Sequence, residues 1–132
     1  VYASTMSVYA DDLMQRYFAD EDLTPDSSHF YGFTKYLGEQ VCANATRLWG
    51  MNVNSLRLCH PRSEETWMSE TALGIPTIAT TGEDVAQAFL AALEFHGGFQ
   101  SFTISGDFEN KIMNMSKARR LLGWEPQARP IK

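Results

Sequence analysis

Apolar residues in this chain fall into short dense runs that are separated by longer periodic stretches. Residues 1–5, VYAST, form an apolar run closed by small hydroxyl residues, which predicts a buried strand. Residues 52–59 and 99–105 have the same character, and Pro61 ends the first of these two runs. We therefore expect three strands, spread along the whole chain.

The longest periodic stretch, residues 28–49, predicts a helix. Gly50 follows it, and candidate N-cap residues precede it at Asp26, Ser27 and Ser28. One face carries small residues that let a helix lie close against a sheet; this face is Tyr31, Lys35, Gly38, Cys42, Ala45 and Trp49. The opposite face is mostly apolar and needs its own cover, such as a partner subunit; it consists of Phe33, Leu37, Val41, Asn44 and Leu48.

Two further helices are predicted downstream. The first covers residues 81–95 and is closed by a pair of glycines, and a short one begins at Asn114 or Ser116 and ends at Leu122. Residues 61–80 predict irregular structure. The alternation of strands and helices indicates an α/β fold with a largely parallel sheet.

Composition places the chain among ordinary globular proteins and narrows its partners. Of its 132 residues, 44% are hydrophobic and 20% are charged, and the formal net charge is −5. Nucleic acids and membrane surfaces require a basic face, so we expect neither as a partner. No apolar run approaches the ~18 residues of a membrane span.

Cysteine, histidine and acidic residues give three further expectations. Cys42 and Cys59 lie inside a predicted helix and a predicted strand, which favours free thiols and a cytoplasmic location. The histidines lack metal-ligand spacing, so we expect no metal; they are His29, His60 and His96. Residues 11–26 are acidic but lack the glycine and the regular alternation of a calcium loop, which favours a solvated loop.

Tyr31 and Lys35 carry the clearest candidate chemistry. Residues four apart are neighbours on one helix face, and an ammonium beside a phenol lowers the pKa of the phenol. To act as a base near neutral pH, a tyrosine needs a shift of about 3 pKa units, or about 4 kcal/mol, so one lysine supplies only part of it. A bound oxidised nicotinamide would supply more. The alternative is a chance pairing of tyrosine and lysine on a helix.

Five segments in order carry a resemblance to a known family. They are VYASTMSVY at 1–9, YGFTKYLGE at 31–39, SLRLCHP at 55–61, EDVAQAFLAALE at 83–94 and LLGWEP at 121–126. Together they resemble the C-terminal portion of the extended short-chain dehydrogenase/reductase family, also called NAD-dependent epimerase/dehydratases. The resemblance covers nearly the whole chain.

The resemblance implies the C-terminal part of a Rossmann-like doubly wound parallel sheet with a small substrate-binding region. Residues 1–132 then form a single incomplete domain, with the catalytic half over 1–60 and the substrate-binding and C-terminal elements over 61–132. None of the nine glycines forms a phosphate-binding fingerprint, so we expect the N-terminal dinucleotide-binding half to be absent and the isolated chain to bind NAD poorly and to be inactive. A fragment of an ordinary enzyme is favoured over a split enzyme or a degenerate binding domain.

The resemblance also implies roles for particular residues. Tyr31 is the expected acid/base, Lys35 holds the nicotinamide ribose and lowers the phenol pKa, and Thr5 hydrogen-bonds the reacting oxygen. Ser4 is the fallback for Thr5. The nicotinamide side is expected at Leu58, Cys59 and Pro61, for which plain core packing is the alternative. The expected substrate contacts are Ser4, Met6, Ser7, His60 and Arg62.

Departures from the family pattern narrow the expected reaction. Met6 and Ser7 stand where sugar-nucleotide 4,6-dehydratases carry Asp-Glu, and a thioether donates no proton, so dehydration is disfavoured. His60 stands where many members have asparagine, which weakens the case for a standard UDP-sugar site. Residues 66–69 faintly resemble uronate dehydrogenases, and Trp67 fits the core as well as a pocket wall.

The expected activity is therefore an NAD- or NADP-dependent epimerase or dehydrogenase reaction at a carbinol of a sugar or sugar nucleotide, with NAD favoured. A uronate-type sugar dehydrogenase is one alternative, and a non-catalytic binding or regulatory relic of the fold is another. We also expect a homodimer formed through the helix that carries Tyr31 and Lys35.

Overall fold

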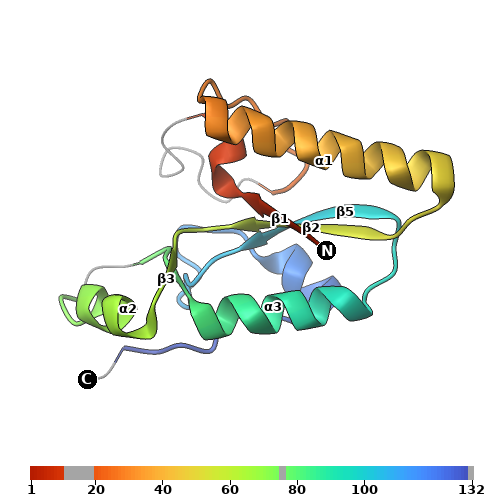
Figure 1. Cartoon of the computed structure of the whole chain (residues 1–132). Helices are drawn as coiled ribbons and strands as arrows, with labels where there is room; N and C mark the ends of the chain where they lie inside the picture. Colours follow the sequence, from red (N-terminus) through yellow and green to blue (C-terminus); the bar gives the residue numbers. More distant parts are fainter. Residues whose placement is uncertain (11–19, 75–76, 131–132) are drawn as a thin grey trace.

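The computed structural model of the chain describes residues 1–10, 20–74 and 77–130, and it has three layers (Figure 1). A small parallel sheet forms the middle layer, with one long helix on one face and a second helix on the other. This is the α/β, Rossmann-like architecture that the sequence predicts.

The central sheet consists of β1 (Tyr2–Thr5), β2 (Val53–Leu58) and β5 (Phe99–Ile104), in the order β1-β2-β5. Both pairings are parallel, with Tyr2 opposite Ser55 and Leu56 opposite Phe102. All three predicted strands are confirmed. Because the strands are parallel, their carboxyl ends lie at one edge of the sheet, where ligands bind in open α/β folds.

The helices α1 (Phe30–Trp49) and α3 (Gly82–Glu94) cover opposite faces of this sheet (Figure 1). α1 ends as predicted at Gly50, which has a positive φ of 65°. Thr81 is the N-cap of α3, and its side chain accepts a hydrogen bond from the Asp84 amide at 3.1 Å. The short C-terminal helix begins at Ser116, within the prediction, and its Ala118–Leu122 part is a π-helix.

The N-cap predicted for α1 is wrong. His29 occupies the cap position and makes no side-chain capping hydrogen bond. The carboxylate of Asp26 instead accepts from the Ala10 amide at 2.8 Å, and the Ser27 hydroxyl accepts from the His29 amide at 3.3 Å. The polar residues before α1 therefore fasten the preceding loop rather than the helix.

The prediction of irregular structure for residues 61–80 is wrong over residues 61–71 and at Thr80, while residues 72–74 and 77–79 form no helix or strand. A second, two-stranded parallel sheet joins β3 (Pro61–Arg62) to β4 (Thr80–Thr81), and α2 (Glu64–Thr71) lies between them. Ser63 caps α2 by accepting from the Thr66 amide at 3.2 Å. The segment is thus a compact connection that folds back beside the central sheet.

Trp67 belongs to the protein interior. Its side chain is fully buried, and its indole nitrogen donates to the carbonyl of Ala79 at 2.9 Å. This settles the open alternative for Trp67 in favour of core packing. Residues 66–69, with their faint likeness to uronate dehydrogenases, lie on α2.

The main apolar core lies between the sheet and α3. Its buried members are Leu56, Ala88, Ala92, Phe102, Ile104, Met115, Ala118 and Trp124. Asp84, at the start of α3, fastens the C-terminal segment to this core because its carboxylate accepts from the amides of Gln127 and Ala128 at 2.7 and 3.1 Å. Trp124 adds an indole hydrogen bond to the Asp84 carbonyl at 3.1 Å.

The face of α1 that meets the sheet agrees with the predicted stripe at its centre, where Ala45 is buried and Gly38 and Cys42 are half-buried, and differs at the exposed ends. The buried residues of α1 are Gly32, Glu39 and Ala45, and Trp49 at the end of the predicted stripe is 72% exposed. Glu39 was not predicted to be buried. The helix therefore lies on the sheet without burying a large apolar side chain.

The acidic segment before α1 is partly outside the described residues, since the prediction covers 11–26 and residues 11–19 are not described. Glu21 is buried, and its carboxylate accepts from the Thr103 amide at 2.8 Å. The solvated-loop prediction is therefore wrong at Glu21. Within the described part of the chain, no three or more His, Cys, Asp or Glu side chains gather as a metal-binding group. No helix in that part is long and apolar enough to cross a membrane.

Candidate active site

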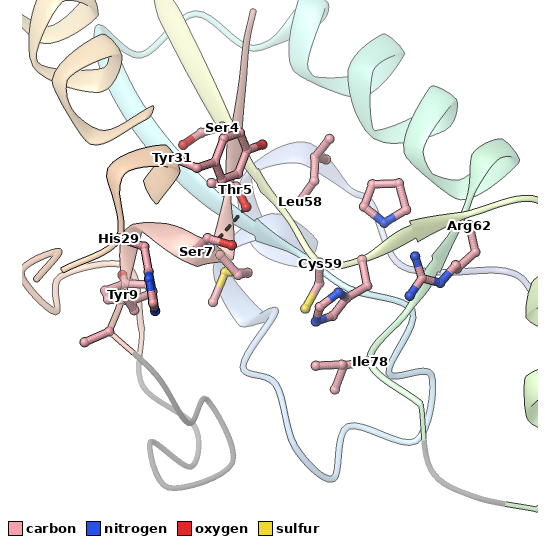
Figure 2. A pocket seen from close by; sticks show the side chains of 14 residues that line it. Ser4, Thr5, Ser7, Tyr9, His29, Tyr31, Leu58, Cys59, Arg62 and Ile78 are labelled. Carbon is pink, nitrogen blue, oxygen red and sulfur yellow. Dashed lines mark hydrogen bonds between the residues drawn. The ribbon is translucent and has the colours of Figure 1, made fainter. Parts of the chain in front are cut away.

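A cavity of about 590 Å³ opens at the carboxyl ends of β1 and β2 (Figure 2). Its walls come from the end of β1, the start of α1 and the segment after β2. The residues that line it are Ser4, Thr5, Met6, Ser7, Tyr9, Ala10, His29, Tyr31, Leu58, Cys59, His60, Pro61, Arg62 and Ile78. The parallel sheet topology brings these distant segments to one place.

All the site residues named from the sequence line this cavity except Lys35. The ammonium of Lys35 lies over the ring of Tyr31, with Nζ 6.0 Å from the ring centroid. Lys35 Nζ donates to the carbonyl of Ala3 on β1 at 2.9 Å. The roles assigned to these residues stay predictions, but their gathering is a property of the fold.

Tyr31 stands at the beginning of α1, and its side chain is 56% exposed. It faces the cavity together with Ser4 and Thr5 at the end of β1 (Figure 2). Gly32 makes this placement possible, because a Cβ at Gly32 would lie 1.9 Å from the carbonyl oxygen of Ser7. A residue with a side chain at position 32 would push the start of α1, and Tyr31 with it, away from β1.

The hydroxyls of Ser4 and Thr5 are used differently. Ser4 Oγ donates its proton to the carboxylate of Glu39, at 2.6 Å from Oε1. Thr5 Oγ1 accepts from the Ser7 amide at 3.1 Å and caps the short 3₁₀ helix η1 (Met6–Val8). Of these two hydroxyls, Thr5 therefore keeps a proton to donate to a bound oxygen. The geometry favours Thr5 over its fallback, Ser4.

The wall after β2 is held in an unusual backbone conformation. His60 has a φ of 40°, in the left-handed region that non-glycine residues seldom adopt. Thr80 fixes this turn with two hydrogen bonds: its amide donates to the His60 carbonyl at 3.3 Å and its hydroxyl donates to the Cys59 carbonyl at 2.8 Å. Strained residues persist where the surrounding structure holds them, and they cluster at ligand sites.

Cys59 gives this wall an apolar character. Its side chain is buried, and burial raises the pKa of the thiol to about 12. The thiol is therefore neutral at physiological pH and acts as a small hydrophobic group. Together with Leu58 and Pro61 it offers an uncharged surface of the kind that a planar ring packs against.

Among the described residues that line the cavity, Arg62 carries the formal charge, and its guanidinium pairs with the Glu70 carboxylate at 3.5 Å. The histidines His29 and His60 also line the cavity, and none of the described lining residues is Asp or Glu. This stands out in a chain whose net charge is −5. A guanidinium and two imidazoles can donate hydrogen bonds to an anionic group in the cavity.

Sequence reasoning missed Tyr9, Ala10, His29 and Ile78 as lining residues. Tyr9 lies within the VYASTMSVY segment that carries the family resemblance, so this motif could have indicated that Tyr9 lines the cavity. Ile78 comes from the stretch predicted to be irregular, and only the β3–β4 pairing brings it to the cavity. No local pattern marks that approach.

Comparison with known protein families decides the class. The model of the NAD dependent epimerase/dehydratase family matches residues 1–79. The chain belongs to this family. Its resemblance to the family and its fold class are thereby confirmed, and the NAD(P) dependence implied by the resemblance is a property of the family.

Solved structures with the same fold include family enzymes of different activities. UDP-N-acetylglucosamine 4-epimerase from Bacillus cereus matches with a TM-score of 0.75 and 24% identity, over 96% of this chain and 56% of that one. UDP-glucuronic acid 4-epimerase from the same organism, in complex with NAD, matches with a TM-score of 0.71 and 19% identity, over 96% and 54%. Glucuronic acid dehydrogenase from Chromohalobacter salexigens matches with a TM-score of 0.74 and 14% identity, over 96% and 46%.

These likenesses establish the fold. The chain spans about half the length of the solved structures that it matches. Among curated proteins, none matches the chain.

Proposed function

We propose that this chain is the catalytic part of a longer NAD(P)-dependent enzyme that acts on a carbinol of a sugar or sugar nucleotide. One observation carries the proposal: Thr5 and Tyr31 line one cavity, with the Lys35 ammonium 6.0 Å from the Tyr31 ring. A phenol and a hydroxyl donor line this cavity at the edge of a parallel sheet, and the ammonium lies outside its lining, near the phenol ring. Family membership supports the cofactor class.

Tyr31 is the acid/base in this proposal. Lys35 Nζ lies 6.0 Å from the centroid of the Tyr31 ring, and Lys35 holds the nicotinamide ribose in this proposal. The carbonyl of Ala3 fixes the ammonium through the 2.9 Å hydrogen bond. The phenolate then removes the proton of the substrate hydroxyl or returns it, while Thr5 donates a hydrogen bond to the same oxygen.

The residues present fit a nicotinamide ring. Leu58, Cys59 and Pro61 form an uncharged wall of the cavity that would hold the ring, and Lys35 would hold the ribose. When bound, the nicotinamide accepts or returns a hydride at the substrate carbon. A glycine-rich turn for the pyrophosphate is not among the nine glycines of this chain, so that part of the cofactor is held by residues outside it.

The substrate carries negative charge in this proposal, as a phosphate or a carboxylate. Arg62, His29 and His60 line the cavity and can donate hydrogen bonds to such a group. Redox chemistry without water elimination is favoured, since Met6 lines the cavity and has no proton to donate. Epimerisation and net dehydrogenation use the same residues, and they differ in whether reduced cofactor is released.

A non-catalytic relic of the fold is the less favoured alternative. A binding domain has no need for Thr5 and Tyr31 to line one cavity with Lys35 over the Tyr31 ring. The uronate-type alternative draws support from the donors that Arg62, His29 and His60 offer to a carboxylate, but residues 66–69, which suggested it, lie on α2 and do not line the cavity.

We further propose that the enzyme is a cytoplasmic homodimer. The free thiols of Cys42 and Cys59 suit a reducing compartment. The outward face of α1 exposes apolar side chains that suit a second copy of the same helix; these are Phe33, Leu37, Val41 and Leu48.

Substitution of Tyr31 by phenylalanine tests the proposed function. In the complete enzyme, assayed with NAD and a panel of UDP-sugars and uronates, Tyr31→Phe should lower turnover by a factor of about 10² or more, because the ring remains and the proton is lost. Tyr36→Phe is the matched control: the next tyrosine of α1 is half-buried and does not line the cavity. Equal activity of the two variants would overturn the assignment of Tyr31.

A further inference from the structure

A buried ion pair lies beneath the cavity and joins α1 to the sheet. Arg57 on β2 and Glu39 on α1 meet through two hydrogen bonds, Nη2 to Oε2 at 2.7 Å and Nε to Oε1 at 2.9 Å. Their side chains are only 4% and 1% exposed. Such bidentate pairs fix both the distance and the orientation of their partners.

The pair extends to two residues of the cavity wall. Ser4 Oγ donates to Glu39 Oε1 at 2.6 Å, next to Thr5, and Ser55 Oγ donates to the same oxygen at 3.1 Å. On the other side, Arg57 Nη1 donates to the Tyr9 hydroxyl at 2.5 Å. The network thus connects β1, α1, β2 and the segment that follows η1.

No large apolar side chain of α1 is fully buried beside this pair; Tyr36 is half-buried and packs against the cluster of Met6, Val8, Tyr9, Cys59, Ile112 and Met113. The other buried residues of the helix are Gly32 and Ala45, which allow close approach to the sheet but bury little apolar surface. Apolar contact is non-directional. The bidentate pair, with Ser4 and Ser55 as further donors to Glu39, is directional and therefore fixes the position of α1 on the sheet. A buried ion pair is weak grounds for stability, and its best-attested use is to fix registry.

We propose that Arg57 and Glu39 are positioning residues for the reaction: their pair fixes where α1 stands on the sheet, and so where Tyr31 stands relative to Thr5. The inference rests on the proposed function, because it concerns the groups assigned there. Glu39 lies eight residues after Tyr31, so about two helical turns separate the anchor from the phenol. A shift of the anchor along the sheet therefore moves Tyr31 by the same amount.

Three variants separate positioning from plain stability. Glu39→Gln removes the charge but keeps the shape of the side chain. The double variant Glu39→Met with Arg57→Met replaces the pair by apolar side chains, which in other buried pairs preserves or raises stability. Phe102→Leu is the control, because it weakens the core on the α3 side of the sheet, away from the cavity.

The readouts are turnover of the complete enzyme and side-chain NMR of Tyr31 and Thr5. Glu39→Gln and the double variant should lower kcat at least tenfold with a change in KM below threefold, and both should move the Tyr31 and Thr5 signals. Phe102→Leu should leave kcat and these signals unchanged. The double variant should regain the urea midpoint lost in Glu39→Gln without regaining kcat.

Recovery of kcat together with stability in the double variant would overturn the proposal, and so would unchanged Tyr31 and Thr5 signals in Glu39→Gln. Lack of turnover in the unsubstituted enzyme with every sugar tested would instead overturn the proposed function. In that case the NMR comparison still decides whether the pair positions the two side chains.

Discussion

At the scale of single residues, two glycines of α1 set its distance from β1. A Cβ on Gly38 would lie 2.0 Å from the hydroxyl oxygen of Tyr2, and one on Gly32 would lie 1.9 Å from the Ser7 carbonyl. Neither glycine is needed for its backbone angles, since both lie inside a regular helix. Their role is steric, and it keeps Tyr31 close to the end of β1.

The effect of Gly38→Ala on the free energy of unfolding should therefore change sign when Tyr2 is replaced. In the native sequence it should destabilise the fold by about 1–3 kcal/mol, because the methyl group meets the Tyr2 ring. In a Tyr2→Ala background the same change should stabilise by about 0.5–1 kcal/mol, the usual gain of alanine over glycine in a helix. Urea unfolding of the four proteins measures both numbers. Identical effects in the two backgrounds would show that Tyr2 does not set the spacing.

At the scale of elements, the seating of α1 depends on an ionised Glu39. Burial raises the pKa of this carboxyl, but hydrogen bonds from Arg57 and Ser4 and the charge of Arg57 outweigh burial, so the pKa falls below its ordinary value of 4.5. A lowered pKa in the folded state means that the carboxylate stabilises the fold above the unfolded value. That contribution is lost as the pH falls through the folded pKa.

The stability of the chain should accordingly depend on this pair in acid. Between pH 6 and pH 3 the urea midpoint of the native sequence should fall, and it should fall less in the double variant Glu39→Met with Arg57→Met, which has no carboxylate to protonate at this position. At pH 7, Glu39→Gln alone should cost about 3–5 kcal/mol, because it leaves the Arg57 charge buried without its partner. Parallel acid profiles for the native and double-variant proteins would contradict the prediction.

At the scale of the whole molecule, the two long helices are covered to different extents. The inner face of α3 packs into the main core. The C-terminal segment covers the first turn of α3, where the Asp84 carboxylate accepts from the Gln127 amide. α1 leaves an apolar outer face exposed, with Val41 69% exposed at its centre. A face of this kind on a long helix suits association with another helix.

A single charged substitution on this face of α1 tests the proposed dimer. Val41→Glu should convert a dimer of the complete enzyme to a monomer, since a carboxylate in an apolar helix contact is left without a partner. Leu73→Glu is the matched control, because Leu73 is 75% exposed and lies just after α2, away from α1. Light scattering at several concentrations gives the mass. A monomeric native enzyme, or a dimer that survives Val41→Glu, would exclude this interface.

The sequence by itself determined the three strands, the helices that became α1 and α3, and the family, because these depend on local periodicity and on motifs of adjacent residues. The family motifs also named ten of the fourteen described residues that line the cavity, since these motifs lie at strand ends. Tertiary structure alone decided the β3–β4 pairing, the burial of Glu39 against Arg57, and which hydroxyl of Ser4 and Thr5 keeps its proton. Each of these depends on groups that are distant along the chain and meet only when the parallel strands align, and no local pattern records such a meeting.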